Sequence, residues 1–191
     1  MIGILPIEGK ELNEKIIKEL HNYISEYFGR FGLNGEVLQK VSIRPFLYAY
    51  DEFRGQFLAS EIAYKLSKIC REKRLTALLG VTDVDLYVRG LNFVFGVALP
   101  PYKSAIISLH RLDPRFYGEP FDYDLFKERA IKEAVHELGH VFGLGHCADP
   151  RCVMHFSNSI LDTDFKGVAF CRSCEEKIKY NIALLNLEGD E

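Results

Sequence analysis

The sequence lacks any long hydrophobic run. No stretch approaches the roughly 20 apolar residues of a membrane-spanning helix, so we expect no membrane partner. The apolar residues 1–7 have no basic segment before them, and the run is shorter than the core of a signal peptide. We therefore expect a cytoplasmic protein that begins with a strand and has no inhibitory pro-segment.

The sequence also lacks an excess of charge of either sign. Its 24 Lys and Arg residues nearly balance its 27 Asp and Glu residues, for a formal net charge of −3. Such a balance gives no electrostatic reason to expect nucleic acid or an anionic membrane as a partner.

Internal repeats, low-complexity tracts and linkers are missing as well. The chain has 191 residues, of which 48% are hydrophobic and 27% charged, the composition and length of one globular domain. We predict a single domain over residues 1–191. Within it we expect an N-terminal subdomain of residues 1–143 and a C-terminal subdomain of residues 144–191.

The first half of the sequence alternates strand patterns with helix patterns. Buried strands are predicted at residues 2–7, 37–43 and 76–81, the last of them central in the sheet. Apolar stripes of helical period lie between them at residues 12–28 and 58–69. This order of elements favours an α/β fold.

The second half adds two strands and two helices. The predicted strands at residues 92–98 and 105–109 are joined by a connection too short for a crossover helix, so one of them must be antiparallel. A long helix is predicted at residues 122–143 and a last one at residues 174–187. The fold class is therefore α/β, a mixed sheet with one antiparallel strand and flanking helices.

The long helix contains the residues that point to chemistry. His136 and His140 are four residues apart, so their imidazoles project from one helix face toward a single metal ion. Glu137 is offset by about 100° around the helix, where a general base for a zinc-bound water would lie. Gly143 allows the chain to turn back, which brings His146 within reach as the third ligand.

Three histidine ligands leave the fourth position of a tetrahedral zinc open, as in catalytic sites. The spacing of two histidines alone arises by chance on ordinary helices. Glycine and a third histidine in place on an amphipathic helix disfavour that alternative. The pattern therefore predicts a catalytic zinc with Glu137 as general base.

The segment from His136 to His146 resembles the elongated zinc-binding signature of the metzincins. Members of that group place a methionine in a tight turn beneath the metal, and Met154 follows the signature closely here. A core methionine that fills a gap is compatible with the same role. The resemblance implies a metzincin-like zincin fold with the active-site helix at about residues 122–143.

The distribution of cysteines resembles one branch of that group, the archaemetzincins. In that family four cysteines hold a second, structural zinc, and such a site would attach the C-terminal part to the active-site loop. Two closely spaced pairs of thiolates also suit a closed tetrahedral zinc site on chemical grounds. Two disulfides or a chance spacing remain alternatives. The cysteines in question are Cys147, Cys152, Cys171 and Cys174.

Phe156 departs from some metzincins, in which a tyrosine two residues after the turn methionine helps to hold the metal or the oxyanion. Phenylalanine does neither, so the oxyanion stabiliser beyond zinc is not identified, and Phe156 is a candidate pocket wall. His155 and His110 are candidate proton donors, with a structural or surface role favoured for both. Cys70 lies on an apolar helix stripe, as expected of an ordinary buried residue.

The sequence thus predicts a zinc-dependent metallopeptidase that acts on peptide or protein substrates. The run at residues 92–98 is the candidate sheet edge for an extended substrate. Endopeptidase and aminopeptidase roles, and the oligomeric state, stay open. The alternative is a zinc protein that binds peptides with little turnover. A zinc ribbon for nucleic acid is disfavoured, because Glu175 and Glu176 follow the last cysteine.

Overall fold

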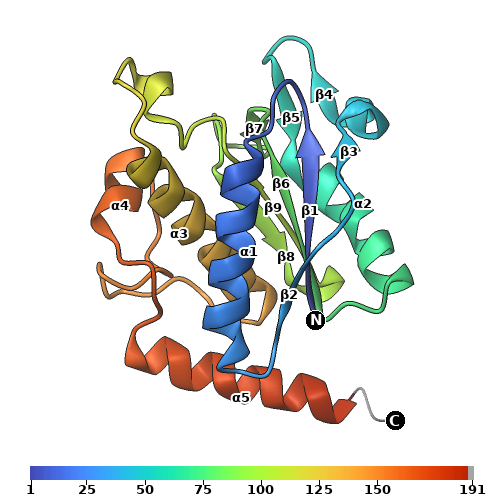
Figure 1. The fold of residues 1–191 in the computed structure, drawn as a ribbon, viewed down its shortest axis with the longest axis vertical. Helices are drawn as coiled ribbons and strands as arrows, with labels where there is room; N and C mark the ends of the chain where they lie inside the picture. The colour runs from blue at the N-terminus through green and yellow to red at the C-terminus, as the bar shows by residue number, and fades with distance from the viewer. Residues whose placement is uncertain (189–191) are drawn as a thin grey trace.

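The computed structural model, which describes residues 1–188, has helices packed on both faces of a mixed β-sheet (Figure 1). The sheet order is β2-β1-β6-β9-β8, and β3 also pairs with β1. All neighbours are parallel except β8, which is antiparallel to β9 and ends the order. The strands are β1 (Ile2–Glu8), β2 (Gly35–Val37), β3 (Val41–Ser42), β6 (Ala77–Thr82), β8 (Gly96–Leu99) and β9 (Ser104–Ser108).

Each face of the sheet has its own hydrophobic cluster. Helices α1 (Glu14–Gly29) and α3 (Tyr123–Val141) cover one face, and α2 (Ala59–Glu72) covers the other (Figure 1). Successive residues of β6 alternate between the two: Leu79 belongs to the cluster of α1 and α3, and Leu78 to that of α2. Because β6 is buried on both faces, it reads in the sequence as a continuous apolar run.

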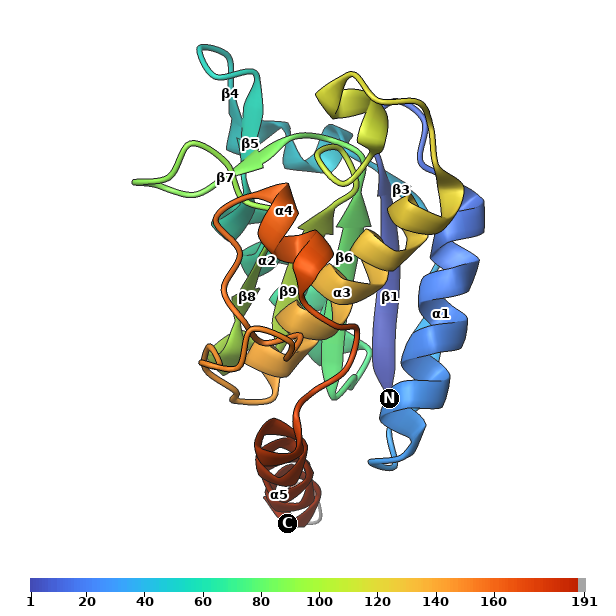
Figure 2. The ribbon, with the colours of Figure 1, turned by 90° about the vertical axis from the view of Figure 1, so that its left-hand side faces the viewer.

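The chain after α3 packs on the side of the molecule that carries α1 and α3. Helix α4 (Ile160–Phe165) packs beside α3, and α5 (Arg172–Glu188) crosses below them (Figure 2). Phe170 and Ile178 join the hydrophobic cluster of α1 and α3. The division into subdomains at residue 143 stays a prediction. Within residues 1–188, no helix is both long and apolar enough to span a bilayer.

The fold class predicted from the sequence is confirmed, and two of its strands need correction. The predicted strand at residues 37–43 is two short strands on β1, separated by residues 38–40, which belong to neither. The predicted strand at residues 92–98 is extended only from Gly96 onward.

A second sheet of three short strands was not predicted. It has the order β4-β5-β7 and stands beside the main sheet at the end where β1 and β6 finish (Figure 2). Strands this short contain too few residues for a period-2 pattern. The strands are β4 (Tyr50–Asp51), β5 (Gln56–Leu58) and β7 (Leu86–Tyr87). The 3-10 helices are η1 (Arg44–Ala49), η2 (Pro100–Tyr102) and η3 (Pro114–Tyr117).

Candidate metal centres and catalytic cleft

Helix α3 carries two of the three predicted histidine ligands on one face. It begins at Asp122, whose side chain accepts the N–H of Leu125 at 3.0 Å. Near its other end, His136 and His140 bring their Nε2 atoms to 3.1 Å from each other. The helix is almost wholly buried around them, so its packing fixes where the two imidazoles point.

Backbone carbonyls orient both rings. His136 Nδ1 lies 2.8 Å from the carbonyl oxygen of Val153, and His140 Nδ1 lies 2.7 Å from that of Leu144. A carbonyl only accepts, so both Nδ1 atoms carry the proton and both Nε2 atoms present lone pairs. Two lone pairs at this separation do not bond each other. A cation between them would satisfy both, which is how the donor set fits a metal.

Gly143 allows the third histidine to join the pair. Its φ of +84° is a left-handed conformation that ends the helix. Asn181 of α5 donates its Nδ2 to the carbonyl of Phe142 at 2.9 Å and so caps the same turn. The metal-binding atoms of the histidine cluster, defined as His136, His140 and His146, all lie within 4.8 Å of one another.

The histidine cluster favours the neutral imidazoles that a metal needs. Burial lowers the pKa of His136 well below its ordinary value, and it lowers the pKa of His140 and His146 as well. Desolvation opposes the charged form of each ring. The rings therefore favour the uncharged form, with one nitrogen free of a proton, which is the form that binds zinc.

Glu137 lies against the edge strand of the sheet. A Cβ on Gly96 of β8 would come within 2.7 Å of Glu137 Cγ and 2.9 Å of the carbonyl oxygen of Ile106. Only glycine leaves room for the carboxylate here. Burial raises the pKa of Glu137 well above its ordinary value, and the nearby Glu133 raises it further. The raised pKa suits a group that takes up and returns a proton.

A buried ion pair next to Glu137 was missed in the sequence. Lys166 Nζ lies 3.1 Å from Glu133 Oε1 and 3.5 Å from His136 Nδ1, and both charged side chains are almost fully buried. Glu133 precedes Glu137 by one helical turn, so its position on α3 was a signal that could have been used. Lys166 comes from the loop after α4, and no local pattern connects it to α3.

Met154 packs against α3 at Gly139, the neighbour of His140 in the sequence, and its supporting role beneath a metal stays a prediction. A Cβ on Gly139 would come within 2.4 Å of Met154 Sδ, so the glycine inside the helix makes room for the thioether. Met154 is fully buried, and its carbonyl accepts the N–H of Cys147 at 2.9 Å. The methionine therefore supports α3 from below and also connects to the loop that carries His146.

The four C-terminal cysteines form a second cluster, defined as Cys147, Cys152, Cys171 and Cys174. Their sulfur atoms lie within 4.8 Å of one another, and all four are free thiols. Cys147 Sγ and Cys171 Sγ are 3.8 Å apart. A tetrahedral zinc with Zn–S bonds of about 2.3 Å separates its sulfurs by about 3.8 Å. The disulfide alternative requires about 2.05 Å between sulfurs.

The cysteine cluster connects the active-site loop to the start of α5. The N–H of Cys171 donates to Cys152 Sγ at 3.2 Å. Tyr27 of α1 holds the segment before it, because its hydroxyl accepts the N–H of Phe170 at 2.8 Å. Burial raises the pKa of Tyr27 to about 12, so this hydroxyl stays protonated. The loop is thereby fastened to both α1 and α5.

A cleft of about 560 Å³ opens over the histidine cluster and Glu137. Its apolar side is the segment between β7 and β8, together with β8 itself. Phe156 forms part of the opposite wall, with its ring centroid 4.9 Å from that of His146. Ser157 Oγ is buried at this wall and has no hydrogen-bond partner within residues 1–188. The remaining lining includes the Glu133–Lys166 pair.

The two lone histidines lie elsewhere. His155 Nδ1 is 3.0 Å from the carbonyl oxygen of Cys147, on the side of the cysteine cluster. His110 lines a different cavity, with Asp83 and Arg115, near the ends of β1 and β6. Neither is among the residues that line the cleft within the described chain. Cys70 is buried in α2, as expected.

The sequence matches the model of peptidase family M54 over residues 4–180. It is 49% identical over 179 residues to an archaemetzincin of Pyrococcus furiosus, covering 94% of this chain and 92% of that protein. It is 46% identical over 169 residues to an archaemetzincin of Methanocaldococcus jannaschii, with 88% of each chain covered.

Solved structures share the fold. The crystal structure of an archaemetzincin from Methanopyrus kandleri superposes with a TM-score of 0.76 at 36% identity, covering 95% of this chain and 96% of that one. The malonate complex of an archaemetzincin from Archaeoglobus fulgidus gives a TM-score of 0.72 at 36% identity, with coverage of 91% and 99%. A zinc-dependent peptidase from Methanocorpusculum labreanum gives 0.79 at 27% identity, with coverage of 92% and 99%.

Proposed function

The chain belongs to peptidase family M54 with the archaemetzincins, a family of zinc metallopeptidases, and on that premise we propose that it hydrolyses peptide bonds with Glu137 as the general base. The observation that carries the proposal is the position of the Glu137 carboxylate. It is buried beside the histidine cluster and faces the same cleft.

The histidine cluster would hold the catalytic zinc. The Nε2 atoms of His136 and His140 present lone pairs, because both rings are oriented through Nδ1. When bound, zinc supplies Lewis-acid chemistry, which acidifies a water molecule and polarises the scissile carbonyl. Gly143 would support the site by turning the chain, and Met154 would support it from below.

Glu137 would take the proton from the attacking water and return it to the leaving amine. Burial raises its pKa, which makes it a stronger base than an exposed carboxylate. The Lys166 ammonium lies on the far side of His136 and faces Glu133, so it neutralises that second carboxylate.

The cysteine cluster would hold a second, structural zinc, giving two zinc ions per chain. All four ligand positions of a tetrahedral ion would be filled by sulfur, which leaves no open position for chemistry. Its role would be to keep the loop of His146 attached to α5. The extended substrate would lie along β8, the last strand of the sheet order, by main-chain hydrogen bonds.

The substitution Glu137→Gln tests the proposal. We expect kcat for peptide hydrolysis to fall by about 10²–10⁴-fold, the range for loss of a general base, with zinc content by elemental analysis unchanged. The control Glu72→Gln removes an exposed carboxylate from the end of α2 and should leave both values unchanged. Full activity of Glu137→Gln would exclude Glu137 as the base. Wild-type protein that holds zinc but cleaves no peptide would favour the binding-module alternative.

A further inference from the structure

The apolar rim of the cleft is an irregular segment, residues 88–95, between β7 and β8. It contributes Val88, Leu91, Phe93 and Phe95 to the lining. Its backbone hydrogen bonds are few: Leu91 donates to the carbonyl of Val88 at 3.1 Å, and only the end at residues 94 and 95 bonds to neighbouring strands. A segment with so little regular structure needs other contacts to keep one conformation.

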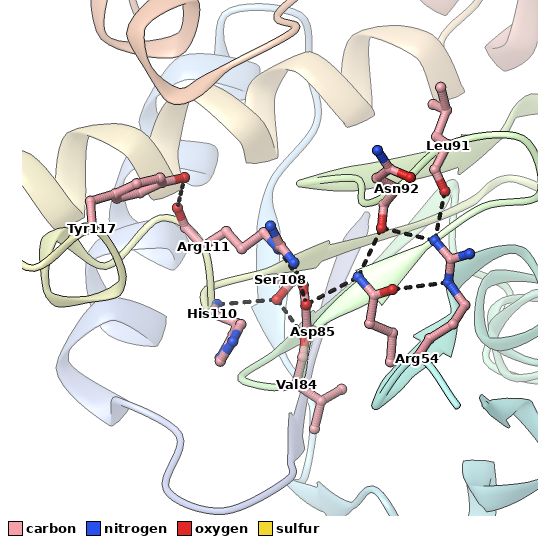
Figure 3. A network of polar contacts seen from close by, with 10 residues as sticks. Arg54, Val84, Asp85, Leu91, Asn92, Ser108, His110, Arg111 and Tyr117 are labelled. Atoms are coloured by element: carbon pink, nitrogen blue, oxygen red, sulfur yellow. Dashed lines mark hydrogen bonds and ion pairs between the residues drawn. The ribbon is translucent and has the colours of Figure 1, made fainter. Parts of the chain in front are cut away.

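Two side chains of the β4–β5 hairpin supply those contacts: Arg54 from its turn and Gln56 from β5 (Figure 3). One terminal nitrogen of Arg54 donates to the carbonyl of Leu91 at 2.9 Å and to that of Asn92 at 3.0 Å. Gln56 Nε2 also donates to the Asn92 carbonyl, at 3.0 Å. Arg54 Nε donates to Gln56 Oε1 at 3.0 Å, so the two side chains fix each other.

Asp85 connects this pair to the main sheet (Figure 3). Its carboxylate accepts two hydrogen bonds from Arg111, both 2.7 Å, and one of 3.0 Å from Gln56. Arg111 follows β9, and its guanidinium lies 4.4 Å from the ring centroid of Phe93. The rim is therefore held at its carbonyls by Arg54 and Gln56, and at the Phe93 ring by Arg111.

We infer that Arg54 and Gln56 are positioning residues that hold the rim of the substrate cleft, residues 88–95, in its binding conformation. Neither side chain lines the cleft within the described chain. They act through the carbonyls of Leu91 and Asn92. This inference rests on the proposed function, because it concerns how that same cleft binds a peptide. A rim that is already ordered binds a substrate without an ordering penalty.

The first measurement follows the rim directly. The chain has no tryptophan, so Phe93→Trp places a single fluorophore on the rim of the zinc-loaded protein. In this background Arg54→Met should increase acrylamide quenching of the tryptophan. Arg54→Lys, which keeps the charge without the planar fork, should have a smaller effect. The control Arg71→Met, an exposed arginine of α2, should leave the quenching unchanged.

The second measurement is steady-state peptide hydrolysis with Phe93 in place. We expect Arg54→Met to raise KM about tenfold, the effect of losing one charge-assisted hydrogen bond, with kcat and zinc content near wild type. Arg54→Lys should fall between. Should Arg54→Met not fold, the Arg54→Lys variant decides by the same two readouts.

Two results would overturn the inference: unchanged quenching with unchanged KM, or a fall in kcat at constant KM, which would place the effect on the catalytic groups. Failure of the proposed function looks different. In that case the wild type would not cleave peptides, and the quenching of Trp at position 93 would still report whether Arg54 holds the rim.

Discussion

The histidine cluster and the cysteine cluster differ in what surrounds them. Two histidines lie on α3, and the third follows the turn that ends this helix. The cleft is open above all three. The cysteines come from two loops and the start of α5, and none of the four lines the cleft within the described chain.

This difference indicates that the histidine cluster serves catalysis and the cysteine cluster serves stability. A rigid helix holds His136 and His140 whether or not a metal is bound, because their Nδ1 atoms already bond to carbonyls. Three of the four cysteines, Cys147, Cys152 and Cys171, lie outside any helix or strand, so a bound ion would contribute to the order of their loops. We expect changes to the cysteines to reduce stability, and changes around Glu137 to reduce turnover.

The largest expected effect comes from breaking the cysteine cluster. Cys171→Ser with Cys174→Ser should reduce the zinc content from two ions per chain to one or fewer, measured on protein purified without added metal. The melting temperature should fall by roughly 10 °C, since several kcal/mol are lost at about 2–4 °C per kcal/mol in a chain of this size.

Cys70→Ser is the matched control, because it makes the same substitution in α2, outside the cluster. It should keep both zinc ions. One zinc per wild-type chain, unchanged in the double variant, would contradict the four-cysteine site and leave the catalytic site standing.

A smaller effect, on kcat and not on zinc content, is expected from a change in the edge strand. Gly96→Ala places a methyl group 2.7 Å from Glu137 Cγ, and the carbonyl of Ile106 at 2.9 Å blocks its retreat. The displaced carboxylate should lower kcat by about 10²-fold, the usual effect of a misplacement near 1 Å, at unchanged zinc content. Gly29→Ala, at the end of α1 with space around it, should keep full activity. Equal rates for the two variants would exclude steric positioning of Glu137 by β8.

The smallest expected effect is on the pH dependence of stability in zinc-free protein. The pKa of His136 is below its ordinary value of 6.5 in the folded state. Below pH 6.5 the unfolded chain therefore binds a proton that the folded chain refuses, and stability falls with pH. His136 should therefore reduce the free energy of unfolding progressively as the pH falls from 6.5 to 5.5. Glu137 has the opposite effect on the pH dependence of stability. Its raised pKa contributes stability that is lost as pH rises above 4.5.

Urea unfolding at a series of pH values checks this expectation. His21→Gln, on α1 away from the clusters, should reproduce the wild-type profile. The decisive profile is that of Glu137→Gln, which removes the opposing carboxylate. A stability of this variant that does not change between pH 6.5 and 5.5 would mean that the buried imidazoles are not held neutral by the fold.

Much of the fold could be predicted from the sequence because its main helices and strands are long. The central strand β6, the helices α1, α2 and α3, and the antiparallel pairing of β8 all follow from apolar periodicity and connection length. Strands of two or three residues carry no such periodicity, so the second sheet was not predicted. The extent of β8 was overestimated because Phe93 and Phe95 look like strand residues but form the cleft rim.

The sequence by itself determined the ligand types, their spacing on α3 and the turn at Gly143, because these depend on helix geometry over neighbouring residues. Only the tertiary structure decided what lies beside them. Lys166 meets Glu133, which is 33 positions earlier in the sequence, and Arg54 reaches the rim from the turn between β4 and β5. Charge pairs and carbonyl contacts of this kind arise from packing between distant segments, and no local pattern encodes them.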